Sequence, residues 1–292
     1  MGNTLESLLS IVIPISTPDE RHLNLEKWIN ESLNLGIQVI LVHDSLNEHD
    51  EKLVDGIAEN FKTPNFVFVR GRFGSPGAAR NAGKAKAKNK WLAFWDSDDQ
   101  PKVNEFYDMV VTGESKGADV VVGGFVEVSS ITGKSIKTIQ CTSIFDLAIN
   151  PGLWRIAFRN EIIKPISFAS FLMGEDQIYL IECLDRVNEL IFVESIVYVY
   201  MSGYRNQLTN KKEIDKDLFL LFTHLSNTIQ KSNRASNMIF FKITISLLIR
   251  AQNAIRVKVA TKLLRLLLKN QRISITNLVV FAFYITKNRI LN

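Results

Sequence analysis

Apolar runs and stretches of mixed polarity alternate along the first 125 residues of the chain. The apolar runs are rich in β-branched residues and have the length of buried strands, and the stretches between them carry apolar residues at helical spacing. The runs predict strands over residues 10–15, 38–44, 65–71, 91–96 and 118–125. The intervening stretches predict helices over residues 24–35, 50–61, 78–88 and 103–111. This alternation predicts an α/β fold with a mostly parallel, doubly wound sheet flanked by helices.

The pattern after residue 140 is less regular. It predicts a helix near 143–149, a turn that opens a helix over 176–187, and a strand over 190–200. The last 80 residues are typical of helices. A chain of 292 residues can form one large α/β domain with an appended part, so we expect a main domain over 1–209 and a helical region over 210–292.

The net charge of +5 is unevenly distributed between these two parts. Residues 210–292 carry 15 Lys and Arg against three acids, whereas residues 1–209 carry 20 bases and 27 acids. A basic C-terminal region predicts an anionic partner, either a phospholipid surface or nucleic acid. It contains no recognised nucleic-acid-binding motif, so an anionic membrane surface is favoured and nucleic acid is not expected. Helices packed on the main domain, or a dimer interface, are the alternatives.

Other features indicate a reducing compartment and predict neither a membrane-spanning segment nor a signal peptide. No apolar run reaches the roughly 18 uncharged residues that span a bilayer. The start of the chain lacks a basic region and predicts a first strand, and not a signal peptide. Cys141 and Cys183 lack the spacing of metal ligands and are expected to be buried, free thiols.

The strongest chemical feature is the segment Asp96-Ser97-Asp98-Asp99, directly after an apolar strand. Three carboxylates in four residues repel one another unless a cation or hydrogen-bond donors compensate. Carboxylate oxygens suit Mg²⁺ or Mn²⁺, which bind through one or two carboxylates together with substrate phosphates. The alternative is an acidic turn in which Asp99 caps the helix that follows.

A second feature is the small-residue segment from Gly74 to Gly83. Small residues let a backbone approach a ligand closely, and the helix start after Gly77 favours an anion. Arg80, one turn into this helix, could pair with a phosphate. Close packing of the helix on the sheet would equally explain the small residues.

Further polar residues stand at predicted strand ends, where ligands bind in sheets of this kind. Ser16, Asp44 and the segment 70–72 should therefore lie on the same edge as Asp96. His43 is interpreted as a structural histidine. The pair Glu175–Asp176, after Gly174, is read in isolation as a helix cap.

Together these segments resemble the family 2 glycosyltransferases, whose nucleotide-binding domain has the GT-A fold. The resemblance covers residues 1–209 and consists of SIVIPIS, ILVHDSLNEHD, GSPGAARNAG, FWDSDD and GED in that order. The strand and polar loop VYVYMSGYRNQLTN are similar as well, and Tyr204 and Arg205 would belong to a loop that closes over the donor. The resemblance implies a GT-A-like, Rossmann-like catalytic domain, with a nucleotide-binding half of about 1–125 and an acceptor half of about 126–209.

The resemblance also assigns roles to individual residues. Asp96 and Asp98 would bind the metal, Mn²⁺ or Mg²⁺, and Asp176 would be the general base with Glu175 as its neighbour. His43 stands where the family often has an acid. The nucleotide sugar would be held by Pro14, Ser16, Asp44, Gly77, Arg80, Asp96 and Ser97.

The implied activity is inverting transfer of a single sugar from a nucleotide sugar, with UDP the usual nucleotide of the family, to a hydroxyl of a glycan or lipid-linked acceptor. Bacterial-type surface polysaccharide synthesis and a cytoplasmic, peripheral position at the inner face of the plasma membrane would follow. The Gln-x-x-Arg-Trp motif of processive polymerases is absent from the sequence, which favours single additions.

Three alternatives stay open. The enzyme could transfer a sugar to polyprenyl phosphate, or the chain could be a non-catalytic scaffold that binds nucleotide sugars. A phosphatase with Asp96 as nucleophile and Asp98 as acid would normally have Thr or Val where Gln100 stands.

Overall fold

The computed structural model describes residues 8–19, 22, 24–169, 174–203, 219, 222–226, 234–250, 257–263, 265 and 279. The chain divides into two compact units. The first contains all the described strands, and the second contains the helices α5 (Ile144–Ile149), α7 (Glu175–Leu184) and α9 (Arg234–Arg250). The predicted functional division after residue 209 stays a prediction.

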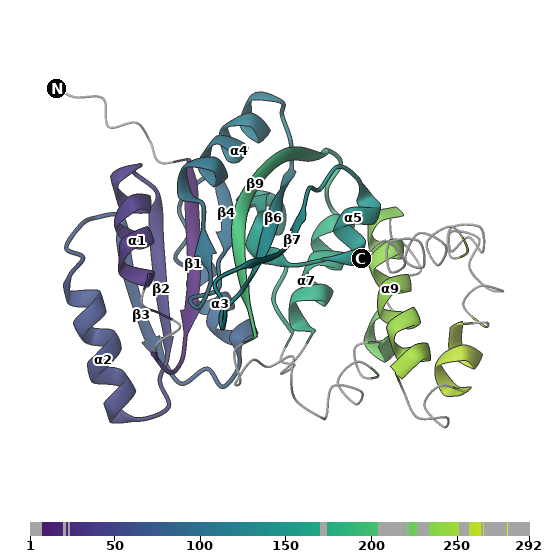
Figure 1. Cartoon of the computed structure of the whole chain (residues 1–292), viewed down its shortest axis with the longest axis horizontal. Coiled ribbons are helices and arrows are strands. Elements are labelled where there is room, and N and C mark those ends of the chain that lie inside the picture. Colours follow the sequence, from purple (N-terminus) through teal and green to yellow (C-terminus); the bar gives the residue numbers. More distant parts are fainter. Residues whose placement is uncertain are drawn as a thin grey trace. The chain divides into compact units, whose positions relative to one another are not determined.

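A mixed sheet forms the framework of the first unit, with the strand order β3-β2-β1-β4-β8-β6-β9-β5 and β7 beside β6 (Figure 1). The strands that the pattern predicted are β1 (Leu9–Ile15), β2 (Gln38–Asp44), β3 (Phe66–Gly71), β4 (Trp91–Phe94), β6 (Val120–Ser129) and β9 (Leu190–Ser202). Those it did not predict are β5 (Gln100–Pro101), β7 (Ser135–Ile139) and β8 (Ile156–Arg159).

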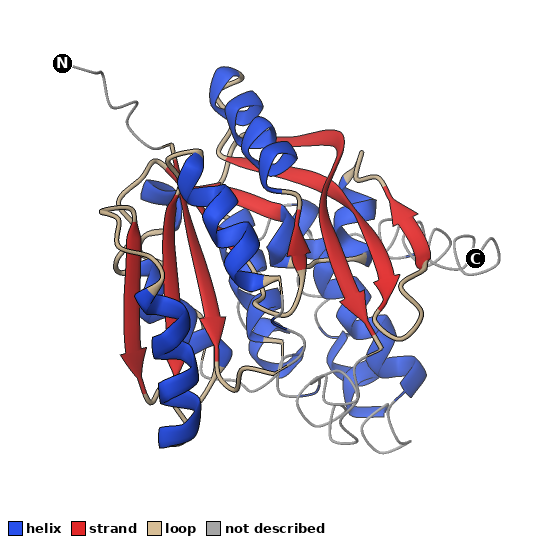
Figure 2. Cartoon of the chain, turned by 60° about the vertical axis from the view of Figure 1, so that its left-hand side comes forward, coloured by secondary structure: helices blue, strands red, loops and turns tan. Residues whose placement is uncertain are grey.

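Strands β3, β2, β1 and β4 are parallel neighbours, so their carboxyl ends lie on one edge of the sheet. Figure 2 shows parallel arrows of this part running in the same direction. Strands β6 and β9 also pair in parallel, whereas β8 pairs antiparallel with both β4 and β6. The expected α/β class and mostly parallel sheet are confirmed, and the antiparallel partners of β4 and β6 are the strands β7 and β8, which were not predicted.

Helices cover both faces of the parallel strands. The connections carry α1 (Leu25–Asn34), α2 (Glu48–Glu59) and α3 (Pro76–Lys84), and α4 (Val103–Ser115) follows β5. The chain moves outward from β1 to β3 and then returns past β1 to β4. Because crossovers of this kind are right-handed, α3 packs on the face opposite α1 and α2. Helix α4 contacts α1 and therefore lies on the α1 face.

Alternate side chains of β1 point to opposite faces of the sheet. Ile11, Ile13 and Ile15 are buried in one cluster with residues of α1 and α4. In that cluster Trp95 makes edge-on contacts with Trp28 and Phe106, at ring-centroid distances of 5.5 and 5.0 Å. A core of this kind holds β4, and hence the acidic segment after it, in a fixed place.

In the second unit, α9 contacts α5 and α7. Ser236 Oγ of α9 donates to the Ile181 carbonyl of α7 at 3.2 Å, and Phe222 stacks on Phe240 at 5.6 Å. Most of the basic region 210–292 lies outside the described residues. Within the described part, none of the helices combines the length and apolar character needed to cross a bilayer. Cys141 and Cys183 are buried thiols that form no disulfide bond, as expected.

Candidate active site

The polar residues that end β1, β2 and β4 follow the strands onto the same edge of the sheet. Pairing of β1 with β2 runs to Ile15 and His43, one residue short of Ser16 and Asp44. Pairing of β1 with β4 ends at Val12 and Phe94, two residues before Asp96. The prediction that Ser16, Asp44 and Asp96 lie on one edge is consistent with this register, and their roles stay predictions.

Pro14 and His43 support the backbone at this edge. Because β4 stops pairing with β1 at Val12, the missing N–H of Pro14 is not needed on that side of the strand. His43 is fully buried, and its Nε2 lies 3.2 Å from the carbonyl oxygen of Ser16. The side chain of Ser16 is exposed. His43 thus has the setting of a structural histidine that fixes the position of Ser16.

Asp44 holds the loop between β3 and α3. Its Oδ1 accepts from the backbone N–H of Phe73 at 2.6 Å and from that of Gly74 at 3.1 Å. Gly74 has a φ of +72°, a conformation that glycine adopts without strain. The carboxylate therefore shapes the small-residue loop and still presents a second oxygen.

Arg70, in the segment 70–72 that was expected at the edge near Asp96, forms an ion pair with a residue of α2. Its guanidinium pairs with Asp55 of α2.

Helix α3 begins at Pro76 and ends at Lys84, so it starts two residues before the predicted helix and ends four residues before it. Ser75 is the N-cap, with Oγ accepting from the Ala78 N–H at 3.2 Å, and Pro76 takes the first position. Gly77 is buried in the first turn. A Cβ at Gly83 would lie 2.4 Å from Val12 Cγ1 and 2.8 Å from Val42 Cγ2. Close packing against β1 and β2 therefore explains why residue 83 is a glycine. The loop before α3 and the first turn of α3 are not explained in this way and can contact a ligand.

Arg80 joins α3 to the acidic segment. Its Nη2 donates to Asp96 Oδ1 at 2.8 Å, and its guanidinium lies 5.6 Å from the ring centre of Phe168. Arg80 is 8% exposed, while the Asp96 side chain is 32% exposed. An ion pair with one partner open to solvent suits a site where further charges bind.

Asp99 does not cap α4, so the capping alternative is wrong. The N-cap of α4 is Lys102, and its side chain makes no capping hydrogen bond. Asp99 is 3% exposed and its Oδ1 accepts from the Met201 N–H of β9 at 2.7 Å. Burial raises the pKa of Asp99 well above its usual range, and the charges of Asp96 and Asp98 raise it further. Asp99 therefore anchors the acidic turn to β9.

Sequence reasoning missed the aromatic and histidine side chains around this turn. The Tyr198 hydroxyl accepts from the Asp96 N–H at 3.2 Å, and Trp154 stacks on Tyr198 and Tyr200 at 4.6 and 5.6 Å. Burial and the neighbouring carboxylates raise the pKa of Tyr200 to about 12. His22 Nε2 lies 3.1 Å from Ser97 Oγ. The aromatic character of the last strand was the available signal for the tyrosines.

The acidic turn fits a divalent cation. Asp96 and Asp98 are both partly exposed, so their carboxylates can be reached from solvent. The described residues include no group of three acidic, histidine or cysteine side chains that could hold a metal by themselves. A site with two carboxylates is still sufficient for Mg²⁺ or Mn²⁺, since substrate phosphates complete the coordination of these ions.

Glu175 and Asp176 open α7 in the second unit. Gly174 is the N-cap with a φ of +85°, and this cap makes no side-chain hydrogen bond. Glu175 is buried and Asp176 is partly exposed, with Asp176 Oδ1 accepting from the Gln177 N–H at 2.8 Å. The predicted loop residues Tyr204 and Arg205 lie outside the described residues.

Three curated relatives share part of the sequence. An uncharacterized glycosyltransferase of Haemophilus influenzae is 26% identical over 191 residues, covering 63% of this chain and 74% of the relative. The succinoglycan biosynthesis protein ExoO of Rhizobium meliloti is 28% identical over 187 residues, covering 56% of this chain and 52% of the relative. Glycosyltransferase GlyG of Streptococcus pneumoniae is 21% identical over 215 residues, covering 67% of this chain and 71% of the relative. The match therefore spans about half of ExoO and about three quarters of the Haemophilus protein.

Solved structures share the fold. Residues 1–349 of S. aureus TarS in complex with UDP-GlcNAc match with a TM-score of 0.62 at 15% identity, over 86% of this chain and 79% of that one. The mannosyltransferase PcManGT of Pyrobaculum calidifontis, in complex with GDP-Man and Mn²⁺, matches with a TM-score of 0.58 at 12% identity, over 97% of this chain and 81% of that one. The expected GT-A fold is thereby confirmed. The model of the family described as Glycosyl transferase family 2 matches residues 10–173, and this chain belongs to that family.

Proposed function

We propose that this chain is an inverting, metal-dependent hexosyltransferase that moves a single sugar from a UDP-sugar to a hydroxyl of a glycan or lipid-linked acceptor. The observation that carries the proposal is the Arg80–Asp96 ion pair at the carboxyl edge of the parallel strands, next to the loop held by Asp44. The relatedness to ExoO supports a role in surface polysaccharide synthesis. The fold shared with the TarS complex of UDP-GlcNAc supports a UDP-sugar donor.

The first unit would bind the donor. Asp44 would accept from the nucleoside base through its second carboxylate oxygen, with Pro14 and Ser16 supporting the nucleoside at the end of β1. The loop before Gly77 and the first turn of α3 would face the diphosphate, because free N–H groups at a helix start favour an anion. Arg80 would contribute a guanidinium to the same phosphates, and Ser97 a hydroxyl.

Asp96 and Asp98 would hold Mn²⁺ or Mg²⁺. A bound ion would supply positive charge that balances the leaving diphosphate. The carboxylates would place this charge at the end of β4, while Arg80 keeps Asp96 oriented. The PcManGT complex with Mn²⁺ supports a divalent cation in a fold of this kind.

Asp176 would be the general base, with Glu175 beside it. Inverting transfer requires a group that takes the proton of the acceptor hydroxyl while its oxygen attacks the anomeric carbon. This assignment rests on the family motif GED and on the partial exposure of Asp176.

The basic region 210–292 would attach the enzyme to an anionic membrane surface. Its 15 Lys and Arg against three acids support electrostatic binding to acidic phospholipids, which would place a cytoplasmic enzyme at the inner face of the plasma membrane. Residues 1–209 would form the catalytic domain.

A nucleotide-release screen tests the proposal. The chain is incubated with a panel of nucleotide sugars and acceptors, with Mn²⁺, Mg²⁺ or EDTA, alongside Asp98→Ala and Asp176→Asn. We expect metal-dependent release of UDP from one donor, lost in both variants, while Asp176→Asn still binds the donor. Donor binding without turnover under every condition would favour the scaffold, and transfer only to polyprenyl phosphate would favour the alternative acceptor.

A further inference from the structure

A basic cavity lies in the first unit, away from the proposed donor site. It has a volume of about 730 Å³ and is formed by the end of α3, the loop before β4, the end of β8, and α6 (Asn160–Ile163) with the residues that follow. Its charged lining consists of one acid, Glu161, and five cations: Lys84, Lys88, Lys90, Arg159 and Lys164. We call it the lysine pocket. Its volume is in the range of small-molecule sites.

The lysine pocket is at the opposite edge of the sheet from Asp96. Asn89 and Lys90 line it just before β4 begins at Trp91, whereas Asp96 follows the end of that strand at Phe94. Four strand residues at about 3.3 Å each separate the two by roughly 13 Å. A ligand in this pocket is therefore distinct from the diphosphate of the donor.

Hydrogen bonds fix the walls of the pocket. Lys84 Nζ donates to the carbonyls of Ile163 and Lys164, each at 3.0 Å, and also to that of Ile166. Asn81 and Phe168 exchange two hydrogen bonds, at 2.8 and 3.0 Å.

On the facing side, Asn160 Nδ2 donates to the Asn89 carbonyl at 3.0 Å, and Asn89 Nδ2 donates to the Leu9 carbonyl at 2.8 Å. These contacts join α3, the loop before β4 and α6, so the walls of the pocket are ordered before any ligand arrives. Little backbone entropy would therefore be lost on binding.

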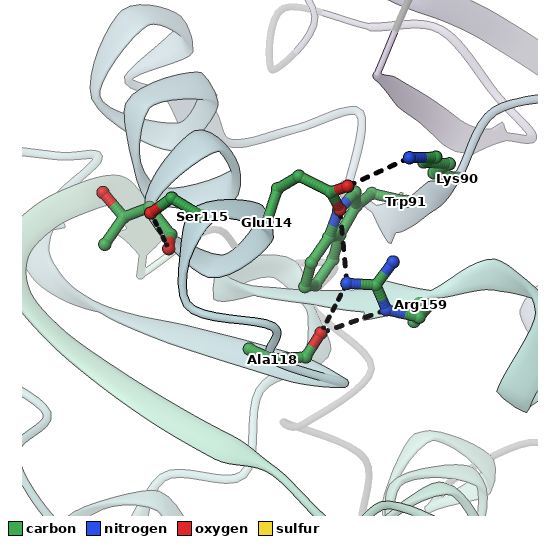
Figure 3. A network of polar contacts seen from close by, with 7 residues as sticks. Lys90, Trp91, Glu114, Ser115, Ala118 and Arg159 are labelled. Atoms are coloured by element: carbon green, nitrogen blue, oxygen red, sulfur yellow. Dashed lines mark hydrogen bonds and ion pairs between the residues drawn. The ribbon is translucent and has the colours of Figure 1, made fainter.

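Two of the cations share a single carboxylate. Lys90 Nζ and Arg159 Nη2 contact opposite oxygens of Glu114, at 3.0 and 3.2 Å, as Figure 3 shows. Arg159 also donates twice to the Ala118 carbonyl and lies over the Trp91 ring at 5.0 Å. One positive charge of this pair is left without compensation.

Lys88 and Lys164 add two more charges. Both are exposed, and within the described part of the chain their ammonium groups make no hydrogen bond or ion pair. Glu161 is the one acid of the lining, so positive charge is clearly in excess. Flexible ammonium groups around a preformed, polar wall are suited to phosphoryl oxygens.

We infer that the lysine pocket binds a phosphoryl group, with the exposed Lys88 and Lys164 as its ligands and with Lys90 and Arg159, both paired with Glu114, beside them. The group can belong to a soluble phosphorylated compound or to a phospholipid headgroup. This inference does not depend on the proposed sugar transfer, since the two sites lie on opposite edges of the sheet.

Titration calorimetry of the full chain with inorganic pyrophosphate, in EDTA, tests the inference. We expect the double variant Lys88→Gln/Lys164→Gln to weaken binding by about tenfold or more, because it removes two charge-assisted contacts. Lys86→Gln is the matched control, since Lys86 is an exposed lysine of the same loop that does not line the pocket. Glu161→Gln should tighten binding, because it removes the one acid.

Further measurements distinguish a soluble phosphate from a phospholipid headgroup, and the lysine pocket from the donor site. If a phospholipid headgroup is the ligand, the variants should bind vesicles of phosphatidylglycerol in the same order of affinity as they bind pyrophosphate. Vesicles of phosphatidylcholine are the comparison. The double variant should keep the wild-type rate of nucleotide release, because Lys88 and Lys164 lie outside the proposed donor site. The inference is overturned if neither probe binds, or if Lys86→Gln weakens binding as much as the double variant does. Unchanged melting temperatures confirm that these surface variants fold.

Discussion

At the residue scale, several side chains of the site also hold the backbone that carries them. Asp44 accepts from two N–H groups of the loop before α3, and Asp99 accepts from β9. Arg80 connects α3 with Asp96. Because Asp44 and Asp96 would also meet the donor and its metal, substitutions here must be chosen to separate structural from functional loss.

Asp99→Ala should destabilise the protein. It removes the acceptor of the Met201 N–H, and a buried group left without a partner costs about 1–3 kcal/mol. Asp99→Asn keeps an oxygen at the same place and should cost less. Urea unfolding of both variants measures the difference, and equal losses would show that the hydrogen bond to β9 is not what Asp99 contributes.

His43 should give the folded state a recognisable pH dependence. Burial lowers the pKa of His43 below its ordinary value of 6.5, and the Arg70 charge lowers it further, against the opposing hydrogen bond to Ser16. As the pH falls through 6.5, the unfolded chain takes up a proton that the folded His43 resists, so stability is lost from there downward.

The stability advantage of the wild type over His43→Gln should accordingly shrink between about pH 8 and about pH 5.5. Urea midpoints of the two proteins at both pH values provide the measurement. A difference that stays constant with pH would mean that His43 does not titrate in this way.

At the element scale, the position of α3 decides where Arg80 and the loop lie. The helix starts at a Ser75 cap followed by Pro76, and its far end rests on β1 and β2 through Gly83. The close approach at Gly83 is possible because no side chain separates the helix from Val12 and Val42.

Gly83→Ala should therefore be harmful although alanine is the better helix former. Its Cβ would meet Val12 Cγ1 at 2.4 Å, and overpacking of this kind costs about 1–3 kcal/mol. Gly56→Ala in α2 is the matched control, because no atom lies within 4 Å of its added Cβ, and it should stabilise by about 0.5–1 kcal/mol. Thermal unfolding compares the two, and a neutral Gly83→Ala would refute the packing argument.

At the scale of the whole molecule, the sequence predicted those helices and strands whose positions depend on the local pattern of apolar and polar residues. The buried strand over 38–44 was predicted with both of its ends, and α1 and α2 within two residues at each end. The short strands β5 and β8 were not predicted. β5 has two residues, and β8, with the sequence IAFR, lacks the longer apolar run that marks β4.

The partners of the acidic turn were missed for a different reason. Asp99 and Met201 lie 102 positions apart, and their contact depends on the pairing of β5 with β9. The same holds for the lysine pocket, whose walls come from segments near 84–90 and 159–167. Sequence patterns locate the strand ends, but long-range pairing decides what surrounds them.

The most direct test of the central claim is the metal dependence of UDP binding. Titration calorimetry would compare wild type, Asp98→Asn and the control Asp108→Asn, which makes the same chemical change at an exposed position of α4. We predict that Mn²⁺ strengthens UDP binding by about tenfold or more in the wild type and in Asp108→Asn, and that Asp98→Asn loses this gain. UDP affinity that is the same with Mn²⁺ and with EDTA, or a gain that survives in Asp98→Asn, would contradict a metal-assisted donor site at the end of β4.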